Sequence, residues 1–165
     1  MDRSNFLDNL IALLSEHAIR YCVIGGQGVN AYVEPLISLD LDLVVAVGQL
    51  EQVESLLQRH FQVERFANSL NVSASGSNLR VQIQTDPRYF VFPDRASVRD
   101  VLGLALPVAS IEDILQGKIW AATDDTRQPS KRRKDLLDIE RLIESYPELR
   151  VRVPHEIRER LANIE

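Results

Sequence analysis

The stretch that decides the fold is residues 39–43, which read Leu-Asp-Leu-Asp-Leu. Alternate side chains of a β-strand face opposite sides of the sheet, so Asp40 and Asp42 share one face and the leucines share the other. The two Cα atoms are then roughly 6.5–7 Å apart, a spacing that lets both carboxylates bind one divalent cation such as magnesium. The alternative is an ordinary strand with a solvated polar face. Aspartate is a poor strand former, so two aspartates inside a Leu- and Val-rich segment need a reason, and this segment alone supports the metal site and the solvated face equally.

A glycine pair precedes this strand. The apolar run 21–24 stops at Gly25-Gly26, and residues 27–33 are expected to form a short helix that ends before Pro35. A strand followed by two glycines and a helix start can bring backbone N–H groups close to a phosphate. Thirteen residues separate Gly26 from Asp40, which is enough for that helix and a return strand beside the first. The phosphate cradle and the metal ligands are therefore expected at neighbouring strand ends.

The composition indicates a folded domain. The 165 residues are 45% hydrophobic and 26% charged, and a chain of this size buries a sizeable core. The net charge of −5 argues against a general nucleic-acid coat protein, although it leaves room for a local basic site. No apolar run is long enough to span a membrane, and Met1 to Asn9 do not resemble a secretory signal. A single cysteine, Cys22, suits a reducing cytoplasm, so we expect a cytoplasmic protein without a membrane partner.

Strands dominate the middle of the chain and helices flank it. This pattern predicts an α+β (mixed α/β) fold, with a core over residues 1–109 and a helical part over 110–165 packed on it as one compact domain. Residues 70–74 and 79–85 are expected to form a hairpin across Ser75 to Asn78, whereas residues 87–109 give no clear assignment. Ser110 is expected to cap one C-terminal helix and Ser130 the next. The other expected elements are helices over 4–18, 49–60 and 154–163 and strands over 38–47 and 61–66.

Together, these motifs resemble a known family. Gly25-Gly26 followed by Asp40-Leu41-Asp42 is similar to the signature of the DNA polymerase β-type nucleotidyltransferase superfamily. The stretch 106–114, Lys118 and the segment Lys134-Asp135-Leu136-Leu137-Asp138 resemble minimal bacterial nucleotidyltransferase-like proteins related to the AbiEii toxin. The resemblance covers roughly residues 20–146. It implies a mixed sheet flanked by helices, and transfer of a nucleoside monophosphate from a magnesium-bound nucleoside triphosphate to a hydroxyl on RNA, protein or a small molecule.

One position departs from the superfamily pattern. The family usually supplies a third carboxylate from a neighbouring strand, and the matching position here is Gln82. A glutamine carbonyl can ligate a metal, but it carries no charge and cannot act as a base near neutral pH. Asp86 has the parity to replace it if the strand extends that far, although Pro87 suggests that the strand ends there. Leu36 is a second departure, because related proteins often place an arginine ahead of the aspartates.

Lys118 and a basic cluster are the remaining candidates. Lys118 falls within the apolar stripe of the helix near residues 111–122, where an ammonium is costly unless it finds a partner. It either reaches the triphosphate or forms a structural ion pair with Asp135 or Asp138. The cluster places five cations within eight residues, where they form a substrate patch or a solvated helix start with Arg132–Asp135 and Lys134–Asp138 pairs. Its members are Arg127, Lys131, Arg132, Arg133 and Lys134.

These observations predict a nucleotidyltransferase-like site. Asp40, Asp42 and Gln82 form the catalytic set, and Asp40 and Asp42 hold Mg²⁺. The nucleotide-binding set comprises Gly25, Gly26, Ser38, Lys118 and Lys134. Two alternatives remain: a regulatory or binding protein that has lost the chemistry, and an RNA-binding module that uses the basic cluster. The resemblance also implies a toxin of a toxin–antitoxin system with an antitoxin partner.

Overall fold

The computed structural model describes the backbone of residues 3–164 and the side chains of residues 6–162. Residues 1, 2 and 165, which the expected domain bounds include, lie outside this part. The helices are α1 (Arg3–Glu16), α2 (Gly25–Asn30), α3 (Leu50–Gln58), α4 (Ile111–Ala122), α5 (Pro129–Ser145) and α6 (His155–Ile164). The strands are β1 (Tyr21–Ile24), β2 (Asp40–Val45), β3 (Gln62–Phe66), β4 (Ser69–Ser73), β5 (Arg80–Gln84), β6 (Ser97–Val101) and β7 (Leu104–Val108). Three 3₁₀ turns cover Pro87–Tyr89, Phe92–Arg95 and Pro147–Arg152.

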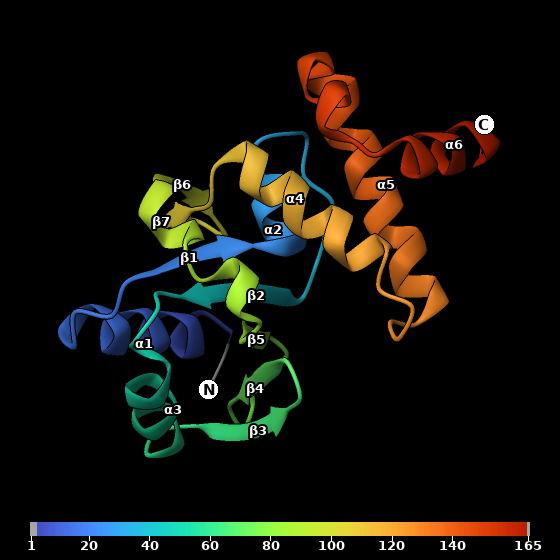
Figure 1. Ribbon diagram of the computed structural model, residues 1–165. Coiled ribbons are helices and arrows are strands. Elements are labelled where there is room, and N and C mark those ends of the chain that lie inside the picture. Colours follow the sequence, from blue (N-terminus) through green and yellow to red (C-terminus); the bar gives the residue numbers. More distant parts are fainter. Residues whose placement is uncertain (1–2, 165) are drawn as a thin grey trace.

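Within the described residues, the strands form one mixed sheet in the order β3-β4-β5-β2-β1-β7-β6 (Figure 1). β2 lies between β1, which runs antiparallel to it, and β5, which runs parallel to it. The acidic strand is therefore at the centre of the sheet, as its Leu- and Val-rich composition indicates. The mixed α and β architecture expected from the sequence is confirmed.

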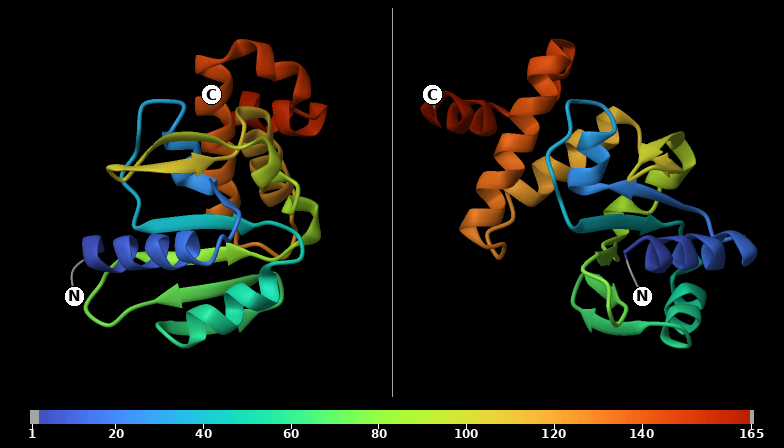
Figure 2. Two further views of the ribbon diagram at one scale, coloured as in Figure 1. Left: turned by 90° about the vertical axis from the view of Figure 1, so that its left-hand side faces the viewer. Right: turned by 180° about the vertical axis from the view of Figure 1, so that it is seen from behind.

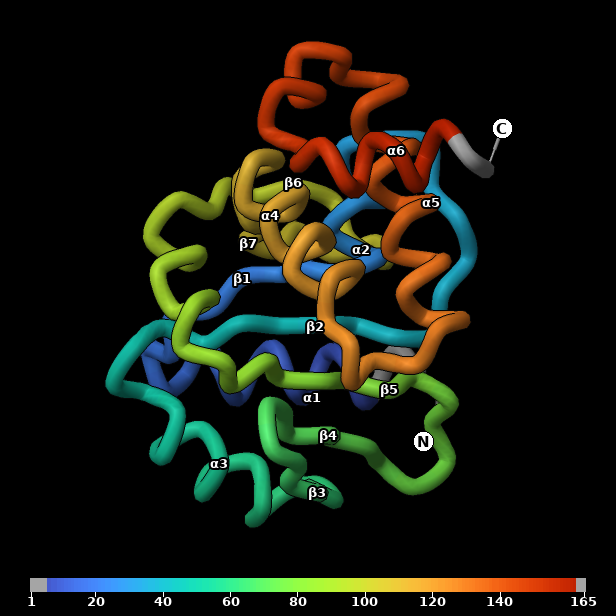
Figure 3. The backbone as a smooth tube through the Cα atoms, turned by 45° about the vertical axis from the view of Figure 1, so that its right-hand side comes forward, coloured from blue at the N-terminus to red at the C-terminus, as the bar shows by residue number. Residues whose placement is uncertain are grey.

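Helices cover both faces of this sheet. α1 and α3 lie against one face, and α4 and α5 lie on the opposite side (Figures 2 and 3). Leu41 and Leu43 of β2 are fully buried, whereas Asp40 and Asp42 keep partial exposure. The alternation predicted for residues 39–43 thus separates a packed face from a polar one.

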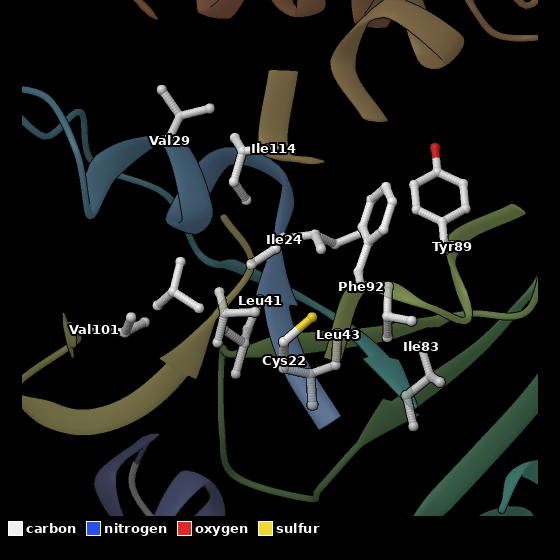
Figure 4. Packing of buried hydrophobic residues seen from close by; sticks show 14 of the residues in the cluster. Cys22, Ile24, Val29, Leu41, Leu43, Ile83, Tyr89, Phe92, Val101 and Ile114 are labelled. Carbon is white, nitrogen blue, oxygen red and sulfur yellow. The ribbon is translucent and has the colours of Figure 1, made fainter. Parts of the chain in front are cut away.

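One buried core joins the elements. In Figure 4, Ile24 at the end of β1 lies near Ile114 of α4, and the rings of Tyr89 and Phe92 lie side by side. Tyr89 and Phe92 contact edge to face, with centroids 5.2 Å apart. This aromatic contact anchors the 3₁₀ turns that follow β5. Among the described residues, no helix is both long and apolar enough to cross a membrane.

Three local expectations need correction. The segment 87–109, unassigned from sequence, contains the β6–β7 hairpin, in which Val101 pairs with Leu104. The second C-terminal helix has Gln128 rather than Ser130 at its N-cap, because Pro129 occupies the first helical turn, where its missing N–H costs nothing. α2 begins at Gly25 rather than after the glycine pair. Ser110 does cap α4, since its hydroxyl accepts a hydrogen bond from the Asp113 N–H at 3.2 Å.

Candidate active site

The strand order brings the predicted site residues together. Asp42 pairs with Ile24 of β1 on one side and with Gln82 of β5 on the other. Gly25 follows Ile24 directly, so Gly25 and Gly26 lie beside Asp42, as the sequence spacing predicts. We call these two residues the glycine turn. Asp42 is thereby placed between the glycine turn and the strand that carries Gln82.

Gly25 and Asp42 are in direct contact. Gly25 has a φ of +67°, a left-handed conformation that L side chains rarely adopt. A β-carbon at this position would also overlap the Asp42 Oδ2 atom. Both the backbone conformation and the lack of a side chain are therefore required for the approach of the two residues.

A cavity of about 80 Å³ opens beside Asp42. Its wall combines the turn after β1, the end of β5, the 3₁₀ turn at Tyr89, and the helices α4 and α5. The lining side chains that matter for the argument are Asp42, Gln82, Gln84, Lys118, Arg127 and Asp135. Asp40 is outside this lining. Its carboxylate forms an exposed ion pair with Arg80 of β5 instead, at 2.8 Å from Nε to Oδ1.

The surroundings of Asp42 raise the pKa of its carboxyl group. Burial raises its pKa above the ordinary value of 3.8, and the nearby charge of Asp40 adds to this effect. Lys118, Arg127 and Lys134 oppose the shift, because each of these cations favours the ionised carboxylate. The two other acids of the cavity wall, Asp113 and Asp135, form ion pairs with Arg95 and with Lys118 and Arg127. Among the described lining residues, Asp42 is the carboxylate left without such a pair.

Lys118 occupies the buried position that its apolar stripe predicts. Its Nζ lies 3.2 Å from Oδ1 of Asp135 and 2.8 Å from Oδ2 of Asp138, and both acids are almost fully buried. Burial opposes the charged ammonium, but the two carboxylates outweigh it, so the pKa of Lys118 is raised above its ordinary value. The structural ion pair considered from sequence is therefore present, and Lys118 also lines the cavity.

Asp135 and Asp138 of α5 are not paired as the helical spacing suggests. Asp135 contacts Lys118 and Arg127, and Asp138 contacts Lys118 and Arg141. The expected Arg132–Asp135 and Lys134–Asp138 pairs are replaced because both carboxylates turn inward, toward α4. Burial of the apolar face of α5 sets this orientation, which sequence spacing along one helix does not reveal.

Lys134 faces the glycine turn instead. A β-carbon on Gly26 would be 3.5 Å from the Lys134 Nζ, so this exposed ammonium lies directly over the turn. The two predicted nucleotide-binding features, separated by more than a hundred residues, are thus adjacent. Ser38 lies outside the cavity lining: its hydroxyl accepts a hydrogen bond from the Asp40 N–H at 3.1 Å and so fixes the start of β2.

The third acidic position holds only neutral amides. Gln82 and Gln84 line the cavity from β5. Asp86 lies beyond the end of β5, where its Oδ1 accepts a hydrogen bond from the Arg88 N–H and its Oδ2 pairs with the Arg88 guanidinium at 2.8 Å. The hydrogen bond from the Arg88 side chain lowers the pKa of Asp86, which is consistent with this capping role. Asp86 therefore does not replace the missing carboxylate.

The donor set fits one hard cation that is completed by a substrate. Magnesium is commonly held by one or two carboxylates, with substrate phosphates and water as the other ligands. Asp40 and Asp42 present two partly exposed carboxylates on one strand face, although Arg80 occupies Asp40. The described residues contain no cluster of three or more acidic, His or Cys side chains able to form a closed metal site.

Several residues of the cavity wall lie outside the predicted catalytic and nucleotide-binding sets. Arg127, Asp135 and Tyr89 line the cavity, and burial raises the pKa of Tyr89 to about 12, so its hydroxyl stays protonated. Arg127 was visible only as a member of the basic cluster. Asp135 lies in the family-like segment 134–138, but the sequence predicts only an ion pair for it. Tyr89 belongs to the stretch after β5 that carried no periodic pattern.

Comparisons with known proteins agree with this geometry. A family model described as "Nucleotidyl transferase AbiEii toxin, Type IV TA system" matches residues 34–163. No curated protein matches the chain.

Solved structures share the fold at low sequence identity. The antibiotic-resistance factor ANT(2″)-Ia, in complex with adenylyl-2″-tobramycin, is 12% identical with a TM-score of 0.63, and the match covers 96% of each chain. The lincosamide antibiotic adenylyltransferase LnuA is 13% identical with a TM-score of 0.54, covering 82% of this chain and 95% of its own. JHP933 from Helicobacter pylori is 18% identical with a TM-score of 0.52, covering 88% and 66%. The family match spans most of the sequence, and the chain therefore belongs to the AbiEii nucleotidyltransferase family.

Proposed function

We propose that this protein transfers a nucleoside monophosphate from a nucleoside triphosphate to a hydroxyl acceptor, with Mg²⁺ as the metal. The observation that carries the proposal is the position of Asp42. This unpaired carboxylate contacts Gly25 at one side and neighbours Gln82 at the other. A phosphate chain bound at the glycine turn therefore lies next to a carboxylate that is free to share a cation with it.

The chain supplies distinct groups for each part of the substrate. Backbone N–H groups at Gly25 and Gly26 would bind the phosphate oxygens, together with the Lys134 ammonium that lies over Gly26. Lys118 and Arg127, held by Asp135, add positive charge at the cavity wall, where transition-state charge develops. Asp40 and Asp42 would hold the metal, which when bound neutralises phosphate charge. Binding at Asp40 requires release of the Arg80 guanidinium.

The test uses labelled nucleotides and matched variants. Purified protein is incubated with each α-labelled nucleoside triphosphate, Mg²⁺ and a cell extract, and label is followed into RNA, protein and small-molecule fractions. Asp42→Asn preserves shape and removes the charge, so transfer should fall by at least about a hundredfold. Glu16→Gln, which removes a charge in the same way at an exposed position of α1, serves as the control. Persistent transfer by folded Asp42→Asn overturns the proposal.

A second candidate function is favoured by Gln82. A nucleotide-binding regulatory protein that has lost the chemistry would also keep Asp42, the glycine turn and Lys134. The neutral amides at Gln82 and Gln84 leave no carboxylate on β5 to accept the proton of an attacking hydroxyl. Calorimetry with nucleoside triphosphates, with and without Mg²⁺, measures binding separately from turnover. Binding without transfer in the wild type, together with transfer gained by Gln82→Asp, supports this candidate.

The family description supports a toxin role that acts with an antitoxin partner. The proposed activity predicts that expression of the chain arrests growth and that Asp42→Asn relieves the arrest. Growth curves with equal protein levels measure this effect. Growth arrest by both the wild type and Asp42→Asn would show that toxicity does not depend on nucleotidyl transfer.

A further inference from the structure

Arg141 links the buried ion pairs of the cavity wall to the loop before β2. Its Nη1 lies 2.9 Å from Oδ1 of Asp138, the acid that also contacts Lys118. Its Nη2 donates to two groups on the other side, the Asn30 Oδ1 at 3.0 Å and the Glu34 carbonyl at 2.7 Å. Only 13% of the Arg141 side chain is exposed, so these contacts are largely shielded from water.

The contacts continue from Asn30 to the acidic strand. The Asn30 amide pairs with the backbone of Leu36, accepting from its N–H at 3.1 Å and donating to its carbonyl at 2.8 Å. The buried Gln27 donates to the Ser38 carbonyl at 3.2 Å, and the Ser38 hydroxyl accepts from the Asp40 N–H. Residues 31–39 form neither helix nor strand. Backbone hydrogen bonds hold their two ends, since Val33 donates to Val29 and the Leu39 carbonyl accepts from the Arg80 N–H, and the side-chain hydrogen bonds hold the part between them.

The charges of the network show that Arg141 is not needed for neutrality. Three cations, Arg127, Lys118 and Arg141, share two buried carboxylates, Asp135 and Asp138. Removing Arg141 leaves two cations for two anions, and Asp138 keeps Lys118 at 2.8 Å. The contribution particular to Arg141 is therefore geometric: its planar guanidinium binds Asp138 with one nitrogen and the loop with another.

We propose that Arg141 is a positioning residue for the reaction, because it sets the placement of the loop 31–39, and hence of Asp40 at the start of β2, relative to Lys118. This inference rests on the proposed function. The proposed metal ligands, Asp40 and Asp42, come from β2, whereas Lys118 and Lys134 come from α4 and α5. Arg141 is the side chain through which α5 holds both the Lys118 ion pairs and the entry to β2.

The experiment compares Arg141→Lys with Arg141→Met. The lysine variant keeps a positive charge that can pair with Asp138, but a single ammonium cannot reproduce both arms of the guanidinium. We expect hydrogen exchange to accelerate in residues 31–39 of Arg141→Lys while the strands β1 and β5 keep wild-type protection. At a temperature where the variant is fully folded, kcat for nucleotidyl transfer should fall roughly ten- to hundredfold. The kcat of Arg141→Met should fall at least as far as that of Arg141→Lys.

Two control variants separate positioning from stability. Leu161→Ala removes a buried side chain of α6 that takes no part in this hydrogen-bond network, and Arg152→Met removes an exposed cation. Both should keep the wild-type kcat and the wild-type exchange of residues 31–39 while folded. Unchanged kcat in Arg141→Lys, or an equal loss in Leu161→Ala, overturns the inference and leaves the proposed function standing. If the wild type binds nucleotide without transferring it, the proposed function fails. Nucleotide affinity is then the measure, and wild-type affinity in Arg141→Lys overturns the inference.

Discussion

Oδ2 of Asp42 occupies the space that a β-carbon on Gly25 would need. Gly25→Ala should therefore do two kinds of damage, because it strains a backbone at φ +67° and displaces the carboxylate. Gly48→Ala is the matched control: Gly48 has φ +85°, but nothing lies within 4 Å of its missing β-carbon. We expect both variants to lose roughly 1–2 kcal/mol of unfolding free energy through strain, and Gly25→Ala to lose more.

Nucleotide binding distinguishes the two glycine variants further. Calorimetry should show weakened binding in Gly25→Ala and wild-type binding in Gly48→Ala. Equal affinities in the two variants would mean that the close approach of Gly25 and Asp42 has no part in nucleotide recognition.

The pKa of Asp42 predicts an acid limit for cation binding. Only the ionised carboxylate attracts Mg²⁺, so affinity should rise with pH about a midpoint above 3.8. Lys134→Met removes a cation that lowers this pKa and should move the midpoint up, whereas Asp40→Asn removes a neighbouring anion and should move it down. Carboxyl-carbon NMR titration measures the pKa directly. Shifts in the opposite directions would contradict the electrostatic assignment.

The same shift affects folding stability with a definite sign. Between pH 3.8 and the raised pKa, native Asp42 holds a proton that the unfolded chain has released. The native state therefore binds more protons, and the free energy of unfolding attributable to Asp42 falls as the pH rises through this interval. Urea denaturation of the wild type and of Asp42→Asn across this range should show a weaker pH dependence in the variant. Identical pH profiles would exclude Asp42 as the source.

Lys118 is expected to matter for the fold as well as for the cavity. Lys118→Met leaves Asp135 and Asp138 buried without their shared cation, and breaking such a pair commonly costs about 3–5 kcal/mol. Because Arg127 and Arg141 remain, we expect Lys118→Met to lose about 3 kcal/mol of unfolding free energy, as measured by chemical denaturation. If Lys118→Met is as stable as the wild type, the ion pairs of Lys118 contribute little to the free energy of unfolding.

Arg80 is expected to compete with cations for Asp40. Their ion pair is exposed, so Arg80→Gln should change the unfolding free energy by less than about 1 kcal/mol. It should nevertheless strengthen Mg²⁺ or Mn²⁺ binding, since Asp40 no longer has to release a guanidinium. Titration of Mn²⁺ followed by electron paramagnetic resonance measures this affinity. Weaker binding in Arg80→Gln would show that Arg80 does not block the ligand.

Local patterns in the sequence predicted much of the fold. Alternation identified β2 and its two faces, and the hydroxyl of Ser110 marked the start of α4. The β6–β7 hairpin was missed because its turn contains Leu102, a leucine at φ +53°, and β7 contains Pro107. Both residues contradict the usual strand and turn preferences, and pairing of β7 with β1 compensates for them.

The candidate site was predictable only in part, for a related reason. Spacing within a short segment predicted that Asp42 and the glycine pair are neighbours. It could not reveal that Lys134 lies over Gly26, because that contact depends on how α5 packs against α4. The inward turn of Asp135 and Asp138 follows from the same packing, which no single-helix pattern describes.

The division of charge along the chain has a consequence for protein engineering. Both candidate metal ligands precede residue 110, whereas the three cations that act on Asp42 all follow it. If the chain were cut between β7 and α4, the first fragment would carry Asp40 and Asp42 and the second would carry the three cations. We expect nucleotide binding to return only when the two fragments reassemble. Such a split protein would report fragment association directly through its restored affinity for nucleotide.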